Sequence, residues 1–134
     1  MNAITWPGIV TLLNVVLLSA LAALVAKARV RYGVKAPATT GDPAFERAFR
    51  VQMNTLENTV AFLPALWLAA LTNPGLVAPA AGAVWLAGRV LYAQAYLKDP
   101  ASRSGGFSIS LLALVVLIIY AAIGLLRPLL TAAA

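Results

Sequence analysis

Cysteine and histidine are both absent from the 134-residue sequence, and charged residues make up only 10 % of it. Without these side chains the protein has no disulfide, no cysteine nucleophile, no imidazole base and no metal site built on Cys or His. A globular domain carries about 25 % charged residues, and a small domain has the most surface per residue to cover. The composition therefore excludes a soluble domain of this size and predicts an integral membrane protein.

What the sequence does contain is a series of long apolar runs. Residues 3–26 and 107–126 carry no charge, and a single charged residue interrupts each of residues 51–71 and 76–97. A helix needs about 20 apolar residues to cross about 30 Å of hydrocarbon, and all four runs reach that length. The sequence predicts an all-α, polytopic membrane four-helix bundle that forms one domain over residues 1–134, with helices at about 5–28, 43–71, 76–97 and 107–131.

Short polar segments connect the predicted helices. Thr72 to Gly75 (TNPG) is typical of a tight turn, and the segment from Lys98 to Gly106 contains a proline and two glycines that break the third helix from the fourth. The longest loop is expected at residues 29–41. Asp42-Pro43 is typical of an N-cap followed by proline in the first helical turn, so the second helix is expected to begin before its apolar stretch.

Basic residues gather at one end of the predicted bundle. Loops one and three hold or adjoin almost all of them, namely Lys27, Arg29, Arg31, Lys35, Arg47, Arg50, Lys98 and Arg103. Because Lys and Arg are enriched in cytoplasmic loops, these two loops are expected in the cytoplasm and both termini on the opposite side, in the inner membrane if the source is bacterial. The basic residues behind the net charge of +6 therefore do not form a solvated basic face, and no nucleic-acid partner is expected.

Two charged residues, Glu57 and Arg89, fall inside apolar runs, where an ionisable side chain costs at least about 2.5–3.5 kcal/mol to insert. They lie at similar depth, so an ion pair between them is expected. Helical spacing places each of them on a polar face. The faces comprise Arg47, Arg50, Asn54 and Glu57 on the second helix, and Arg89, Tyr92 and Tyr96 on the third.

These polar faces contain more hydrogen-bond donors than an ion pair needs. Arg50 and the loop residues Arg29 and Arg103 would stay unsatisfied if Glu57 and Arg89 only neutralised each other. Guanidinium groups bind carboxylates in a bidentate manner. The pattern predicts a ligand with more than one carboxylate, and an ammonium group facing Glu57. The alternative that stays open is that the pair only fixes helix register.

Small and polar residues also indicate how the helices associate. Ala61, Ala65 and Ala69 recur at every fourth position of the second helix, a spacing that lets membrane helices approach closely. This ladder predicts that the second helix forms the core of an oligomer. Asn14 and Ser19 in the first helix are expected to form hydrogen bonds to neighbouring helices.

Three segments resemble the MAPEG family, the membrane-associated proteins of eicosanoid and glutathione metabolism that include microsomal glutathione transferases and leukotriene-C synthase. They are Phe45 to Asn58 (FERAFRVQMNTLEN), Gly88 to Tyr96 (GRVLYAQAY) and Asp99 to Arg103 (DPASR). The resemblance covers about residues 25–106. It implies a homotrimer of four-helix subunits, with glutathione bound between neighbouring subunits toward the cytoplasmic side.

The resemblance also implies roles for individual residues. Arg103 matches the arginine proposed to stabilise the glutathione thiolate. Two positions depart from the family pattern, because Asn58 stands where leukotriene-C synthase has a tyrosine ligand and Val60 where several members have proline. The implied glutathione-binding residues are Arg29, Arg50, Gln52, Asn54, Glu57, Arg89, Tyr92 and Tyr96.

Glutathione carries two carboxylates, an ammonium and a thiol, so it matches the predicted ligand and supplies the nucleophile that the sequence lacks. The predicted function is a membrane-bound glutathione transferase of detoxification, acting on lipophilic electrophiles and possessing a possible lipid hydroperoxide peroxidase activity. Two other functions stay open: a small proton-coupled multidrug exporter and a non-catalytic lipid-binding relative. Four arginines around one carboxylate argue against the exporter, because they repel a cationic drug, and Arg103 argues against the non-catalytic relative.

Overall fold

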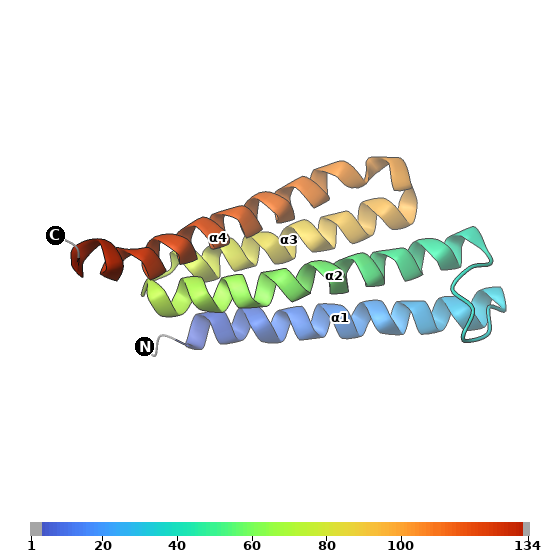
Figure 1. The fold of residues 1–134 in the computed structure, drawn as a ribbon. Helices are drawn as coiled ribbons and strands as arrows, with labels where there is room; N and C mark the ends of the chain where they lie inside the picture. The colour runs from blue at the N-terminus through green and yellow to red at the C-terminus, as the bar shows by residue number, and fades with distance from the viewer. Residues whose placement is uncertain (1–3, 133–134) are drawn as a thin grey trace.

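The computed structural model describes residues 4–132, and within them the chain forms four long helices and no strand (Figure 1). The helices are α1 (Thr5–Tyr32), α2 (Pro43–Thr72), α3 (Val77–Lys98) and α4 (Ser104–Ala132), and a short 3-10 turn, η1 (Pro100–Arg103), precedes α4. The predicted all-α, four-helix architecture is confirmed. The ends of the predicted domain, residues 1–3 and 133–134, lie outside the described residues.

The four helices run up and down side by side in one elongated bundle. In Figure 1 the α1–α2 and α3–α4 connections lie at one end of the bundle, and both chain ends lie at the other. This topology places the basic residues of the first and third loops at the same end. The second connection, between α2 and α3, lies at the end that holds the termini.

Three of the four helices, α1, α2 and α4, are long and apolar enough to cross a membrane. The 22-residue α3 is not among them, so the prediction of four spans is confirmed for α1, α2 and α4 and stays a prediction for α3. Polar side chains such as Arg89 and Gln94 lower its hydropathy. It nevertheless lies within the bundle, where it packs along α4 and α2.

The first loop is shorter than expected because α1 continues past Ala28 to Tyr32. Gly33 ends the helix with a φ of 66°, a left-handed conformation that glycine adopts without steric cost. Asp42 caps α2 as predicted, since its carboxylate accepts a hydrogen bond from the backbone N–H of Ala44 at 2.8 Å. The loop therefore spans residues 33–42.

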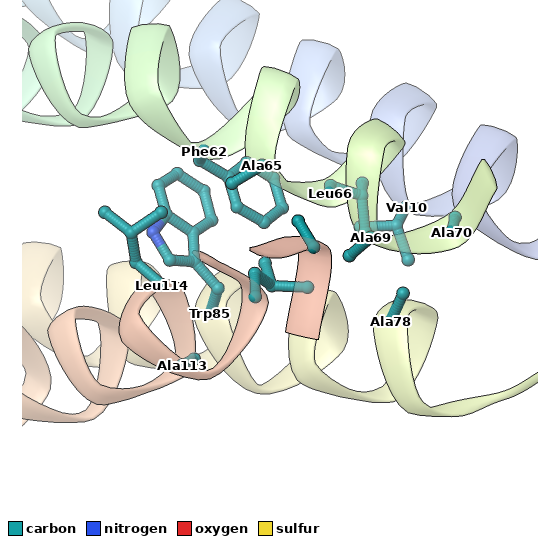
Figure 2. Close-up of a cluster of buried hydrophobic side chains, with 12 residues drawn as sticks. Val10, Phe62, Ala65, Leu66, Ala69, Ala70, Ala78, Trp85, Ala113 and Leu114 are labelled. Atoms are coloured by element: carbon teal, nitrogen blue, oxygen red, sulfur yellow. The ribbon is translucent and has the colours of Figure 1, made fainter. Parts of the chain in front are cut away.

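The apolar core lies where all four helices meet, and its centre is a parallel stack of Phe62 on Trp85 with ring centroids 3.8 Å apart (Figure 2). Ala65 and Ala69 belong to the same buried cluster. The predicted oligomer ladder is therefore wrong for these two residues, which pack inside their own chain. A four-residue repeat drifts around a helix of 3.6 residues per turn, so only Ala61 faces outward.

The two polar residues singled out on α1 behave differently. Asn14 is fully buried, and its side-chain oxygen accepts a hydrogen bond of 3.3 Å from the hydroxyl of Thr59 on α2. The prediction of an interhelical hydrogen bond is confirmed for Asn14. It is wrong for Ser19, which lies on the exposed side of α1 and donates to the carbonyl of Val15 in its own helix.

Glycine controls the contact between α3 and α4. The predicted connection over residues 98–106 is confirmed at Asp99 and η1 but ends earlier than expected, because α4 begins at Ser104 and passes through Gly105 and Gly106. A Cβ on Gly106 would overlap the backbone nitrogen of Tyr92, and one on Gly88 would lie 2.7 Å from the backbone nitrogen of Ser110. The absence of side chains at these positions lets the two backbones touch and fixes Tyr92 against the start of α4.

Candidate functional site

Two adjoining pockets open at the loop end of the bundle, one of about 600 Å³ (pocket A) and one of about 360 Å³ (pocket B). Pocket A lies between the first turns of α2 and the start of η1, and pocket B lies between α2, α3 and the first turns of α4. Arg50 and Tyr96 line both pockets and so join them into one site. Six of the nine predicted site residues line one pocket or both: Arg50, Asn54, Glu57, Tyr92, Tyr96 and Arg103.

The repeat of α2 explains why three of these side chains share a wall. Arg50, Asn54 and Glu57 follow one another at spacings of four and three residues, which place them on one face of the helix. The adjacent face carries the fully buried Val51 and Thr55 and turns toward the rest of the bundle. The polar face is left open to the pockets, so the predicted polar stripe of α2 is confirmed as a feature of the fold.

Arg89 lies behind this wall rather than in it. Its side chain is fully buried, and its Nη2 donates hydrogen bonds to the Asn54 side-chain oxygen at 2.8 Å and to the Thr55 hydroxyl at 2.9 Å. Its guanidinium also lies over the ring of Tyr92, 4.2 Å from the centroid. Arg89 therefore holds Asn54 and Tyr92 in place from below and lines neither pocket.

The predicted ion pair between Arg89 and Glu57 is wrong for this chain. Thr55 and Glu57 are two positions apart, which turns their side chains about 200° from each other around the helix. The guanidinium meets the Thr55 side of α2, whereas Glu57 stays exposed on the side that holds Arg50. Arg89 and Glu57 lie at similar depth in the bundle, but similar depth does not determine the direction in which each side chain points around its helix.

The Arg89 guanidinium has no carboxylate partner among residues 4–132. Its Nε and Nη1 atoms are buried and have no hydrogen-bond partner within residues 4–132. Buried ionic groups are normally paired, because an isolated charge in a medium of low dielectric constant is costly. The uncompensated charge lies behind pocket B and raises the electrostatic potential there, which favours an anionic ligand.

Thr55 is a site residue that sequence reasoning missed. Its hydroxyl accepts the second hydrogen bond from Arg89, and its burial completes a polar layer beneath the pockets. The sequence contained a signal for it. Thr55 lies four residues after Val51 and four before Thr59, a spacing that places all three on one buried helix face, and Thr55 brings a hydroxyl to that face. An intramembrane arginine needs such acceptors, so a search for its partners on α2 would have found Thr55.

Arg103 stands at the rim of pocket B, where the 3-10 turn η1 holds it. Asp99 caps this turn by accepting a hydrogen bond of 3.0 Å from the Ala101 N–H, and the Ser102 hydroxyl donates to the Asp99 carbonyl at 2.7 Å. The guanidinium of Arg103 lies 5.8 Å from the ring centroid of Tyr96. These hydrogen bonds stabilise the turn that carries Arg103.

Two predicted ligands lie outside the pockets of their own chain. The Nη1 of Arg29 donates a 2.8 Å hydrogen bond to the carbonyl of Ala38, and its guanidinium covers the ring of Phe45 at 4.8 Å, so that it ties the first loop to α2. Gln52 is two positions from Arg50, about 200° around the helix. Neither residue lines pocket A or pocket B.

The two departures from the family pattern have simple structural descriptions. The side-chain amide of Asn58 donates to the Asn54 carbonyl at 2.8 Å within α2, and Asn58 lines neither pocket. Val60 is 70 % exposed, and the proline within α2 is Pro64, one turn further along the same face. Within residues 4–132 there is no cluster of three or more His, Cys, Asp or Glu side chains that could hold a metal ion.

The chain is similar to several known proteins. One relative, an uncharacterized protein of Synechocystis sp., is 44 % identical over 121 residues, which cover 90 % of this chain and 88 % of that protein. Microsomal glutathione S-transferase 2 of Homo sapiens is 40 % identical over 101 residues, or 75 % of this chain and 69 % of that protein. Leukotriene C4 synthase of Bos taurus is 38 % identical over 123 residues, or 92 % of this chain and 82 % of that protein.

A model of the MAPEG family matches residues 7–123, a longer stretch than the segments that carried the resemblance. The match extends over most of α1 and into α4, beyond the polar residues of α2 and α3. Together with the helical bundle and three helices of membrane-spanning length and apolarity, it describes an integral membrane protein. The chain belongs to the MAPEG family.

Proposed function

We propose that this protein is a membrane-bound glutathione transferase, in which pockets A and B hold glutathione and its thiolate attacks a lipophilic electrophile. The observation that carries the proposal is the convergence of six polar side chains on one continuous site with a surplus of guanidinium groups. The names of the related microsomal glutathione S-transferase and leukotriene C4 synthase support it.

The charges of the site suit the functional groups of glutathione. Arg50, which lines both pockets, binds a carboxylate, and Glu57 on the same wall receives the ammonium group. Tyr92 and Tyr96 position the tripeptide, and the buried charge of Arg89 favours its anionic groups. A cationic drug would meet repulsion from the same guanidinium groups, which counts against an exporter.

Arg103 is assigned to the chemistry because of its position at the rim of pocket B. A thiol with a pKa of about 8.5 is only a few per cent ionised at neutral pH, and a nearby guanidinium lowers that pKa by favouring the anion. The thiolate sulfur then forms a bond to the electrophilic carbon, and the leaving group departs with the bonding electron pair. The second activity that we propose is reduction of a lipid hydroperoxide. The thiolate attacks the terminal peroxide oxygen, the O–O bond breaks and the lipid leaves as its alcohol; a second glutathione then converts the resulting sulfenic acid to the disulfide and water.

Two of the implied glutathione ligands are missing from the pockets of this chain. Arg29 and Gln52 line neither pocket A nor pocket B, so we propose that an adjacent subunit of a homotrimer supplies them. The exposed face of α2, which includes Val60 and Leu71, is then the surface closest to the trimer axis. The loop end of the bundle faces the cytoplasm in this arrangement, where glutathione has access to both pockets.

Mass measurement in mild detergent is expected to give three copies of the chain. Val60→Trp adds bulk to the exposed face of α2 and is expected to lower the trimer fraction severalfold. Val116→Trp is the matched control on the exposed side of α4 and should leave the trimer intact. A parent protein that is only monomeric or dimeric would contradict the homotrimer.

Glutathione binding to the detergent-solubilised protein tests the proposed function itself. Arg50→Ala is expected to raise the dissociation constant about ten- to a hundredfold, because a charge-assisted hydrogen bond is worth roughly 1.5–3 kcal/mol. The control is Arg127→Ala, which removes an exposed arginine near the other end of the bundle. Calorimetry measures both constants.

The same titration separates the alternatives. A lipid-binding relative without catalysis would not bind glutathione, and an exporter would bind a lipophilic cation in its place. Unchanged affinity in a folded Arg50→Ala variant would remove pockets A and B from the glutathione site.

A further inference from the structure

A third pocket, pocket C, lies at the loop end of the bundle between the last turns of α1 and the first turns of α2. Its volume is about 420 Å³. Leu24, Ala28 and Leu97 give it an apolar floor, and Lys27, Arg31 and Arg47 bring positive charge to its walls. Of the described residues, none that lines pocket C carries a carboxylate. The pocket therefore combines an apolar interior with a cationic rim.

The three cations share pocket C without a counter-ion. Lys27 and Arg31 are four residues apart on α1, so they lie on one face of that helix, and Arg47 faces them from α2. The Nε of Arg47 is buried and has no hydrogen-bond partner within residues 4–132. Three positive groups around one cavity repel one another, and an anion bound between them would relieve that repulsion and satisfy the free donor.

The surface next to pocket C identifies what kind of anion fits. A shallow, almost wholly apolar groove runs along α1 between Ala26 and Val30, and its other lining residues are Lys27 and Arg31 of pocket C. Val30 is 87 % exposed, an exposure that suits contact with lipid on a helix long and apolar enough to cross a membrane. A small soluble anion would use the cations alone, whereas a lipid would also cover this groove with an acyl chain.

We propose that pocket C binds an anionic phospholipid. Lys27, Arg31 and Arg47 hold the phosphodiester, and an acyl chain lies along the groove between Ala26 and Val30. Basic pockets at the ends of membrane helices take anionic headgroups by this combination of charge and apolar contact. Arg47 also lines pocket A, whereas Lys27 and Arg31 line neither pocket A nor pocket B. The variants that test this site therefore change only Lys27 and Arg31.

Native mass spectrometry of the full chain in a non-ionic detergent tests this site. Phosphatidylglycerol and phosphatidylcholine with identical acyl chains are titrated separately, and phosphatidylglycerol is expected to bind at least about tenfold more tightly. The double variant Lys27→Gln/Arg31→Gln is expected to weaken phosphatidylglycerol binding about thirtyfold, the value for two lost cation contacts with an anionic lipid. Phosphatidylcholine binding should change little.

The matched control is Lys35→Gln/Lys98→Gln, which removes the same charge from the same end of the bundle but from outside pocket C. It should keep phosphatidylglycerol binding within about threefold of the parent. If both double variants weakened phosphatidylglycerol binding equally, net charge alone would attract the lipid. If the parent bound phosphatidylglycerol and phosphatidylcholine equally, the pocket would not distinguish the two headgroups. Either result overturns the proposal.

A competition experiment distinguishes a lipid from a soluble phosphate. Glycerophosphoglycerol has the same phosphodiester headgroup without acyl chains, so it should not displace phosphatidylglycerol at equal concentration. Displacement would assign pocket C to a small anion and overturn the lipid assignment. The melting temperature gives an independent readout, because a lipid that binds only the folded chain stabilises it. Phosphatidylglycerol should raise the melting temperature of the parent and not that of the Lys27→Gln/Arg31→Gln variant.

Discussion

Replacing Arg103 with alanine is expected to reduce turnover at neutral pH by about tenfold for each unit by which the thiol pKa rises. An opposite charge within about 4–6 Å lowers a pKa by roughly one to three units, and η1 holds the Arg103 guanidinium at the rim of pocket B. The guanidinium favours the thiolate, so its removal raises the pKa of the bound thiol. As the pH is lowered, the variant therefore loses its activity at a higher pH than the parent does.

A pH–rate profile with an activated aryl halide measures this shift, and the absorbance of the thiolate measures it without turnover. Glutathione affinity should stay within about threefold, because Arg50 and Glu57 still bind the tripeptide. Arg103→Lys keeps a positive charge but not the planar guanidinium, and an intermediate midpoint is expected. The parent rate and the parent profile in Arg103→Ala would refute the catalytic assignment and leave Arg103 as a residue of membrane topology.

The second large effect is expected from Gly106→Ala, which should destabilise the contact between α3 and α4. The added Cβ meets the backbone of Tyr92 and Gly88, and backbone cannot move aside as the end of a side chain can. Overpacking of this kind costs about 1–3 kcal/mol and occasionally more. The melting temperature in detergent should fall, and glutathione affinity should fall with it because Tyr92 lines pocket B.

Gly105→Ala provides the control for this variant. Gly105 lies beside Gly106 in the same helix, but a Cβ there would have no atom within 4 Å. Alanine is the better helix former by about 1 kcal/mol, so this variant should be as stable as the parent or more stable. Equal melting temperatures for the two alanine variants would show that α3 and α4 are not in backbone contact at Gly106.

The sequence predicted the helices well because their signals are local. The length of each apolar run, the Asp42-Pro43 cap and the TNPG turn each depend on a few neighbouring residues. The extension of the third connection through Gly105 and Gly106 was wrong for the opposite reason. Glycine is used there to admit a neighbouring helix, and the identity of that neighbour is not visible in the segment itself.

The site was predicted in outline because residues on one helix face stay together wherever the helix packs. Arg50, Asn54 and Glu57 reach their pockets on this basis. The partner of Arg89 was not predictable by the same rule, since it depends on how α2 and α3 are rotated relative to each other. That rotation is set by the packing of Phe62 on Trp85, two residues that lie far apart in the sequence.

The arginine within α3 has a consequence for how the protein enters its membrane. An arginine inside an apolar helix opposes the insertion of that helix on its own, and Arg89 lies fully buried in α3. The cost of Arg89 is reduced once Asn54 and Thr55 of α2 accept its hydrogen bonds. The third helix is therefore expected to leave the translocon together with its neighbours, and biogenesis of this protein depends on α2 being in place before α3 arrives.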